Sequence, residues 1–207
     1  MKPDRSVYSL YLIASSESGP DPLRKIMKAV DSGVTMVQLR EKTLSSRDFF
    51  NRALSLKKCL EPYRIPLIIN DRADIALAVE ADGVHLGQSD LPLRAARSLL
   101  GPEKIIGASA GTLETACRAA AEGCDYIGAG ALFSTMTKHN AKTISCDTVE
   151  RITRRLSVPV IAIGGITPED IPLLLNLGIS GVAVSSAILG SENINAAVST
   201  FRHILGL

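Results

Sequence analysis

Short apolar segments alternate with amphipathic segments along the whole chain. Stretches with apolar residues at helical spacing cover residues 22–31, 47–60, 113–122, 168–177 and 193–205. The apolar segments are rich in β-branched residues and number eight: SLYLIAS, MVQLR, PLIIN, GVHLG, KIIGAS, YIGAG, PVIAIGG and GVAVSS. Strands joined through helices must run parallel, and parallel sheets bury both faces, which accounts for nearly continuous apolar strands. The pattern predicts a repeated β–α unit.

Eight units in 207 residues leave about 26 residues each, which is tight for a (β/α)8 barrel of the usual size, about 250 residues, but workable with short loops. Gly33, Gly123 and Gly178 follow predicted helices, where a left-handed cap ends a helix. The alternative is an open doubly wound sheet, but its GxGxxG fingerprint is absent after the first strand. We expect one α/β domain over residues 1–207, a single (β/α)8 TIM barrel.

Composition excludes several classes of partner. With 23 Lys+Arg against 21 Asp+Glu, the chain lacks a positive field for nucleic acid or a membrane surface, and 4% aromatics without Trp argue against base stacking. No segment approaches ~18 uncharged apolar residues, and the N-terminal run lacks a signal-peptide cleavage site. Four cysteines without CxxC or zinc-finger spacing predict free thiols. We expect a cytoplasmic protein that binds no nucleic acid and no membrane.

Charged residues follow the second predicted strand, in the segment QLREK. The catalytic site of a (β/α)8 barrel lies at the carboxyl ends of its strands. If strand conformation persists, alternation places Gln38, Arg40 and Lys42 on one face, whereas Val37 and Leu39 face the helices. Two cations would then meet at the barrel mouth. The alternative is a solvated strand end that leads into a helix.

Two carboxylates, Asp71 and Asp90, follow the next two strands. Adjacent strands are about 4.8 Å apart, so these side chains can approach each other. Mg²⁺ takes one or two carboxylates together with phosphate oxygens and water, and two carboxylates beside two cations therefore suggest a magnesium diphosphate site. The alternative is that each aspartate caps the helix after it, which is worth about 1 kcal/mol. We expect His85 to be a satisfied core or supporting histidine and not a ligand.

Four further strand ends carry candidate residues. Gly165 after the seventh strand and Ser185 and Ser186 after the eighth stand where barrels often bind phosphate on backbone N–H groups; the alternative is a turn with a serine helix cap. Ser109 ends the fifth strand as a donor at the mouth or a small strand residue. The polar segment 134–140 after the sixth strand is expected to be a lid, or else a mobile surface loop.

Taken together, these segments resemble a known family. QLREK, LIINDRADIALAVEADGVHLGQSDLP, IIGASA, TMTK, AIGGI and VSSA follow one another over residues 37–189 as they do in thiamine phosphate synthases. The glycine motifs are common among phosphate-binding barrels, but QLREK with NDR and HLGQSDLP is specific. The resemblance implies a transferase that condenses 4-amino-2-methyl-5-hydroxymethylpyrimidine diphosphate with 4-methyl-5-(2-phosphoethyl)thiazole to thiamine phosphate and diphosphate.

The resemblance also implies roles for individual residues. The implied cofactor is Mg²⁺, held by Asp71 and Asp90, and the implied catalytic residues are Arg40, Lys42, Ser109 and Lys138. The pyrimidine diphosphate would contact Gln38, Leu39, Arg40, Glu41, Lys42, Asn70, Ser109 and Lys138. The thiazole phosphate would contact Thr135, Thr137, Gly165, Ser185 and Ser186, and Met136 is implied as a further substrate-binding residue.

The implied chemistry explains why no Ser/His/Asp arrangement is found. Diphosphate leaves a CH2 group on an electron-rich aminopyrimidine, so the carbon develops cationic character before the thiazole nitrogen attacks, and no protein nucleophile is needed. Two other functions stay open: a related thiazole tautomerase, which would not require the metal pair, and a non-catalytic sensor of phosphate ligands. The sequence also leaves open whether the chain forms a homo-oligomer.

Overall fold

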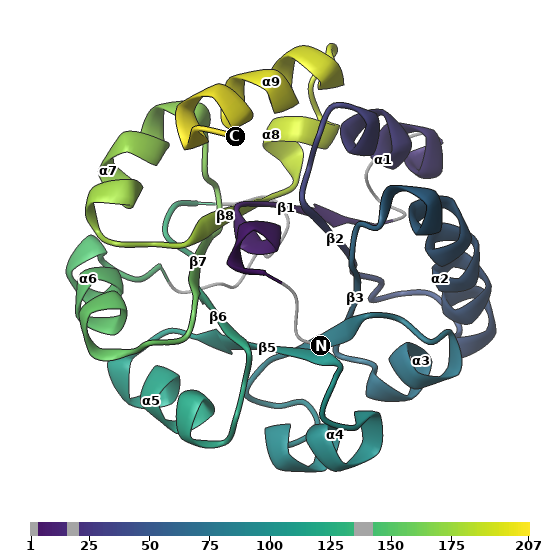
Figure 1. Cartoon of the computed structure of the whole chain (residues 1–207), viewed down its shortest axis with the longest axis horizontal. Helices are drawn as coiled ribbons and strands as arrows, with labels where there is room; N and C mark the ends of the chain where they lie inside the picture. The colour runs from purple at the N-terminus through teal and green to yellow at the C-terminus, as the bar shows by residue number, and fades with distance from the viewer. Residues whose placement is uncertain (1–3, 16–20, 135–142) are drawn as a thin grey trace.

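The computed structural model describes residues 4–15, 21–134 and 143–207. Within them, eight parallel strands follow one another in chain order around a closed barrel, which closes where Leu10 of the first strand pairs with Val182 of the last (Figure 1). The predicted barrel is therefore confirmed, and the doubly wound alternative is wrong. The strands are β1 Leu10–Ala14, β2 Met36–Leu39, β3 Leu67–Asn70, β4 Gly83–Leu86, β5 Ile105–Ala110, β6 Tyr126–Gly130, β7 Val160–Ile163 and β8 Gly181–Val184.

Helices surround this barrel (Figure 1). The five predicted ranges agree closely with α1, α2, α5, α7 and α9, except that 168–177 divides into a 3₁₀ helix and an α-helix. Gly33, Gly123 and Gly178 have φ values of 101°, 87° and 80°, which confirms the predicted left-handed caps. The helices are α1 Pro22–Asp31, α2 Ser46–Leu60, α3 Ala73–Ala78, α4 Leu93–Leu100, α5 Leu113–Ala121, α6 Cys146–Arg155, α7 Ile171–Asn176, α8 Ser186–Leu189 and α9 Ile194–Leu205, with 3₁₀ helices η1 Arg5–Tyr8, η2 Glu61–Tyr63 and η3 Pro168–Asp170.

The apolar core has two parts because strand side chains alternate between the two faces of the barrel wall. Side chains such as Val37 and Leu39 point outward and pack against the helices, as predicted. Inward-pointing side chains form a smaller cluster that includes Tyr11, Met36 and Tyr126. No helix of the described residues is long and apolar enough to span a membrane.

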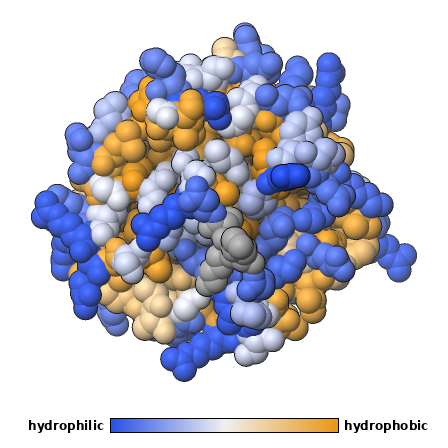
Figure 2. Space-filling model, in the orientation of Figure 1, coloured by the Kyte–Doolittle hydropathy of each residue, from blue (hydrophilic) through white to orange (hydrophobic). Residues whose placement is uncertain are grey.

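One end of the barrel is covered by η1, which lies inside the ring of strands in Figure 1 and whose Val7 and Tyr8 pack against the inward-pointing cluster. The Asp4 carboxylate accepts a hydrogen bond from Arg5 N (2.6 Å) at the start of η1. A Cβ on Gly181 would lie 1.9 Å from the Tyr8 carbonyl oxygen, so η1 fits directly against the beginning of β8. Figure 2 shows this end of the molecule, with hydrophilic side chains around its edge and apolar ones visible between them.

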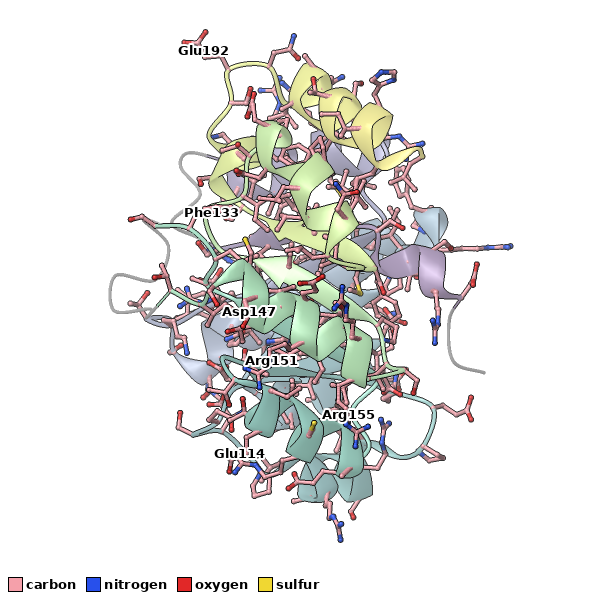
Figure 3. The ribbon with its side chains drawn as sticks, turned by 90° about the vertical axis from the view of Figure 1, so that its left-hand side faces the viewer. Glu114, Phe133, Asp147, Arg151, Arg155 and Glu192 are labelled. Atoms are coloured by element: carbon pink, nitrogen blue, oxygen red, sulfur yellow. The ribbon has the colours of Figure 1, made fainter. Side chains whose placement is uncertain are left out.

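The opposite end is the mouth, where the strands end and the loops to the helices begin. In the side view of Figure 3, Phe133, which follows β6, lies toward the mouth, while η1 lies on the other side. Helix α6 runs from Asp147 on the mouth side toward Arg155, antiparallel to the strands. The carboxyl ends of all eight strands therefore present their side chains at one place.

Candidate active site

The QLREK segment places two cations at the mouth. Strand β2 ends at Leu39, and Arg40 N donates a hydrogen bond to the Ala14 carbonyl at the end of β1 (2.8 Å), which keeps the segment against its neighbour. Arg40 and Lys42 both line the mouth, and Lys42 pairs with Asp71. Gln38 is inside the barrel, nearly fully buried. Strand conformation ends before Arg40, so the predicted alternation does not extend to Arg40 and Lys42; these two cations nevertheless reach the mouth, as predicted, while Gln38 stays in the barrel interior.

Asp71 and Asp90 face the mouth and cap no helix. Asp71 has φ of 63° and donates its N–H to the His85 carbonyl (2.8 Å), so its backbone belongs to the end of the β3–β4 ladder. The Asp90 carboxylate accepts a hydrogen bond from Gly87 N (2.7 Å). Helices α3 and α4 begin without any side-chain cap hydrogen bond. The capping alternative is therefore wrong for both aspartates.

The two carboxylates interact with each other. Burial raises the pKa of Asp90, and a hydrogen bond with the neighbouring Asp71 raises it further, while the Gly87 N–H and Lys42 act in the opposite direction. A carboxylate whose charged form is disfavoured by burial and by a neighbouring acid is a site that a cation would stabilise. Within the described ranges, no group of three or more His, Cys, Asp or Glu residues is placed so that it could hold a metal ion. Two hard oxygen donors beside an open pocket fit Mg²⁺, which completes its coordination with water and phosphate.

These groups line a pocket of about 450 Å³, here called the acidic pocket. Its floor includes the buried side chains of Asn70 and His85, which are neighbours in the β3–β4 register. Gln88 reaches across it, donating to the Ser109 carbonyl (2.8 Å) and accepting from Arg118 (2.6 Å). The full lining is Arg40, Lys42, Asn70, Asp71, His85, Gly87, Gln88, Ser89, Asp90, Ser109, Ala110, Gly111 and Gly130.

A second pocket, the glycine pocket, lies at the ends of β6, β7 and β8. It is smaller, about 120 Å³, and carries the predicted Gly165, Ser185 and Ser186. Its main-chain walls need small residues: Gly165 has φ of 66°, and a Cβ there would lie 2.4 Å from the Ser134 carbonyl oxygen. The full lining is Ile13, Arg40, Ser109, Gly128, Gly130, Ala131, Ile163, Gly164, Gly165, Ile166, Ala183, Val184, Ser185, Ser186 and Ala187.

The lack of a side chain at Gly165 lets another part of the chain come close to it, namely Ser134 and Phe133 after β6. The alternative of a serine helix cap finds no support, because the side chain of Ser185, the residue before α8, makes no cap hydrogen bond. Ser186 is the first residue of that helix.

Arg40, Ser109 and Gly130 line both pockets. Ser109 is on β5 and is hydrogen-bonded through Oγ to His85 Nε2 (2.8 Å). His85 Nδ1 lies 2.9 Å from the hydroxyl of Tyr126, and this hydroxyl lies 2.9 Å from that of Tyr11. His85 is thus a satisfied supporting histidine, as predicted. Sequence reasoning missed Tyr11 and Tyr126, whose inward positions in apolar strands were their only signal.

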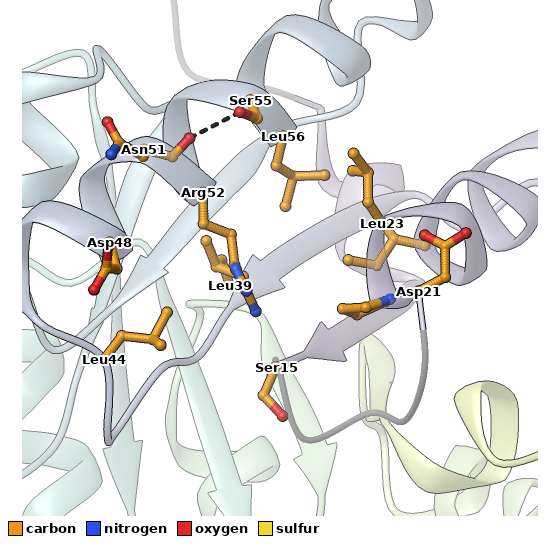
Figure 4. A pocket seen from close by; sticks show the side chains of 12 residues that line it. Ser15, Asp21, Leu23, Leu39, Leu44, Asp48, Asn51, Arg52, Ser55 and Leu56 are labelled. Carbon is orange, nitrogen blue, oxygen red and sulfur yellow. Dashed lines mark hydrogen bonds between the residues drawn. The ribbon is translucent and has the colours of Figure 1, made fainter.

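Three predicted substrate residues of the described ranges line neither pocket: Gln38, Leu39 and Glu41. Gln38 is buried inside the barrel, where its amide donates to the Tyr11 hydroxyl. Leu39 packs in the outer core, and the Glu41 side chain is buried and pairs with Arg52 (3.2 Å). Leu39 and Arg52 instead border a separate cavity of about 500 Å³ between α1 and α2 (Figure 4). In Figure 4, Arg52 points from α2 toward Leu39, while Asp21 and Leu23 approach from α1. This cavity lies outside the barrel wall, and it shares no lining residue with the acidic pocket or the glycine pocket.

The predicted loop residues Thr135, Met136, Thr137 and Lys138 lie outside the described residues. The predicted lid over 134–140 lies outside them for the same reason, except for Ser134.

A (β/α)8 barrel whose mouth combines a carboxylate pair, two cations and a glycine pocket belongs to the class of barrel enzymes, which carry their active sites at this end. A family model described as thiamine monophosphate synthase matches residues 10–188. The thiamine-phosphate synthase of Alkaliphilus oremlandii is 48% identical over 197 residues, 94% of each chain. That of Ruminiclostridium cellulolyticum is 49% identical over 199 residues, 95% of each.

Solved structures agree with the sequence comparisons. The thiamine phosphate pyrophosphorylase from Pyrococcus furiosus matches with a TM-score of 0.90 and 34% identity, covering 98% of this chain and 97% of that one. A 3-hexulose-6-phosphate synthase, at 17% identity and a TM-score of 0.72, shares the fold. The chain belongs to the thiamine monophosphate synthase family.

Proposed function

We propose that this chain is a thiamine-phosphate synthase, which joins 4-amino-2-methyl-5-hydroxymethylpyrimidine diphosphate to 4-methyl-5-(2-phosphoethyl)thiazole. The observation that carries the proposal is that the acidic and glycine pockets meet at Arg40, Ser109 and Gly130. A condensation requires two ligands whose reacting atoms are in contact, and two pockets that share a wall allow this. Family membership supports the same conclusion.

The acidic pocket suits the pyrimidine diphosphate. Arg40 and Lys42 supply positive charge, and the buried Asn70 supplies an amide that can donate and accept. Asp71 and Asp90 would hold Mg²⁺, which when bound neutralises charge on the diphosphate oxygens. Lys42 pairs with Asp71, so its ammonium group is already next to the position where the phosphates would be.

The glycine pocket suits the phosphate of the thiazole. Its walls after β7 and β8 are backbone and small side chains, with Ser185 and Ser186 as hydroxyl donors, and barrels commonly bind phosphate after these two strands. Arg40, at its border, supplies a cation. We also assign Thr135 and Thr137 to the thiazole phosphate, Lys138 to the diphosphate and Met136 to substrate binding, on the resemblance of the TMTK segment.

The protein's own residues stabilise the charge that develops on the leaving group and position the two ligands. As the bond between the CH2 carbon and the diphosphate breaks, negative charge grows on the leaving group, and Arg40, Lys42 and the Ser109 hydroxyl stabilise it. The carbon, now electron-poor, is attacked by the thiazole nitrogen held in the adjacent pocket. Water must be excluded from this carbon, and the closed floor of the barrel removes one of its routes.

The decisive experiment incubates the purified protein with both substrates and Mg²⁺ and follows diphosphate release together with thiamine phosphate formation. Formation of both products supports the proposal. A thiazole tautomerase would bind the thiazole phosphate without metal-linked binding of the diphosphate, and a sensor would bind ligands without releasing diphosphate. Absence of thiamine phosphate with both substrates present would refute the synthase.

A further inference from the structure

A buried chain of hydrogen bonds crosses the barrel interior and ends at Ser109, the serine that both pockets share. We propose that this chain holds His85 as the tautomer protonated on Nε2 and thereby makes the Ser109 hydroxyl a donor toward the reacting ligands. Tyr11, Tyr126 and His85 are then positioning residues that act through Ser109. The inference rests on the proposed function in one respect only, the identity of the ligand atom that accepts the hydrogen bond from Ser109.

The direction in which these groups donate their hydrogens follows from the first of them, Gln38. Gln38 Nε2 lies 2.7 Å from the Tyr11 hydroxyl, and an amide N–H can only donate. If Tyr11 also accepted from Tyr126, its own buried hydrogen would have no acceptor among the described contacts, which is costly. Tyr11 therefore donates to Tyr126, at 2.9 Å.

The remaining hydrogens follow from this first step. The Tyr126 hydroxyl, having accepted from Tyr11, donates to His85 Nδ1 at 2.9 Å. A neutral imidazole that accepts at Nδ1 carries its hydrogen on Nε2, and Nε2 donates to Ser109 Oγ at 2.8 Å. Ser109 Oγ has then accepted a hydrogen bond, and its own hydrogen is free to point into the pockets.

The barrel is built around this chain. Gln38, Tyr11, Tyr126 and His85 are 2%, 1%, 0% and 6% exposed, so water competes little for their hydrogen bonds. A Cβ on Gly107 would lie 2.0 Å from Tyr126 Cζ, and one on Gly128 would lie 3.0 Å from His85 Cε1. Glycine at these inward positions makes the space that both rings occupy. The His85 and Tyr126 rings stack with centroids 5.5 Å apart.

Both phenols remain neutral links in the chain. Burial raises the pKa of Tyr11 and of Tyr126 well above the ordinary value of a tyrosine. A donor at Ser109 stabilises an anionic oxygen more than a neutral one, and in the proposed reaction this charge grows on the leaving diphosphate. If all these hydrogen bonds ran in the opposite direction, the Ser109 hydroxyl would donate to His85 and would present only its lone pairs to the ligands. It would then oppose that charge.

The tautomer is measured directly by ¹⁵N NMR of the histidine side chains. The protein has three histidines, and spectra of the His139→Gln and His203→Gln variants assign the remaining signal to His85. The expected wild-type result is an Nδ1 shift typical of an unprotonated nitrogen and an Nε2 shift typical of a protonated one. The reverse pattern, or a mixture, would overturn the inference, whatever reaction the protein catalyses.

A double-mutant cycle tests whether the chain acts through Ser109. We expect Tyr126→Phe to lower kcat about tenfold in the wild type but less than twofold in the Ser109→Ala background, since the target of the effect is then gone. Tyr8→Phe is the matched control: its ring packs 5.3 Å from that of Tyr126, but its hydroxyl is outside the chain, so neither kcat nor the His85 spectrum should change. Equal losses from Tyr126→Phe in both backgrounds would mean a merely structural role.

Discussion

Two pairs of aspartates, one at each end of the barrel, differ in what surrounds them. Asp82 and Asp125 precede β4 and β6 at the end closed by η1, whereas Asp71 and Asp90 follow β3 and β4 at the mouth. The Asp82 carboxylate accepts hydrogen bonds from Leu67 N and Lys57 Nζ, both at 2.9 Å. The Asp125 carboxylate does the same for Ile106 N (2.8 Å) and Arg97 (2.6 Å).

At the closed end, each aspartate carboxylate binds both a backbone N–H at the start of a neighbouring strand and a cationic side chain from a helix. The negative charge of the aspartate is therefore compensated within the fold. At the mouth, Asp71 and Asp90 lie against each other, and burial together with the neighbouring acid raises the pKa of Asp90. The same side chain thus stabilises the barrel at one end and leaves a site for a ligand at the other, as expected where stability and catalysis occupy opposite ends.

The largest expected effect comes from the mouth pair. Asp71→Asn or Asp90→Asn should lower turnover at least about a thousandfold, roughly 4 kcal/mol of transition-state stabilisation, because each removes a charge that would hold Mg²⁺. Steady-state kinetics with thermal unfolding measures both properties. Asp74→Asn, which alters an exposed carboxylate nearby, should leave turnover unchanged. Full activity of both mouth variants would refute the metal assignment, and loss of folding would mean that the pair is structural.

The closed end should respond in the opposite way. Asp125→Ala leaves the Ile106 N–H and the Arg97 guanidinium without this partner, so we expect the free energy of unfolding to fall by about 3 kcal/mol while kcat of the folded enzyme stays the same. Urea unfolding provides the measurement. Asp147→Ala, at an exposed i,i+4 pair on α6, should cost under about 0.5 kcal/mol. A loss of kcat in Asp125→Ala would contradict the assignment of stability to the closed end and of catalysis to the mouth.

The two pockets of the mouth should differ in their need for metal. With Mg²⁺, the pyrimidine diphosphate should stabilise the protein by about 2.7 kcal/mol at a hundredfold excess over its dissociation constant, and by much less without metal. The thiazole phosphate should stabilise it nearly equally in both conditions, because no carboxylate is among the described residues that line its pocket. Thermal shift titrations with and without EDTA compare them. Equal metal dependence for both ligands would contradict the division into two pockets.

The smallest expected effect concerns Cys124, next to Asp125 at the closed end. Burial, and secondarily the charge of Asp125, raises the pKa of this thiol to about 12. At pH 8 the reactive thiolate is therefore scarce, and alkylation should be slower at Cys124 than at the partly exposed Cys59 and Cys117. Reactivity should increase as the pH rises toward the pKa. Mass spectrometry of iodoacetamide-treated protein gives the order, and early labelling of Cys124 would show that this end opens.

Much of this architecture could be predicted from the sequence because it depends on local patterns. Strand order, helix ranges and left-handed caps follow from periodicity and glycine placement, and the polar residues at strand ends follow from the barrel rule. Partners distant in the chain could not be predicted. Glu41 pairs with Arg52 and not with the mouth, and Tyr11 meets Tyr126 across 115 residues, by contacts that only the closed barrel creates.

The position of η1 limits how substrates enter the barrel and how products leave it. Because η1 and the tyrosines below the mouth fill the other end, the described part of the barrel offers ligands one opening. Both substrates must enter, and both products must leave, through that opening. A product that lingers in either pocket therefore blocks the next substrate for that pocket, so thiamine phosphate should compete with both substrates, and the slowest departure should set the pace of the whole cycle.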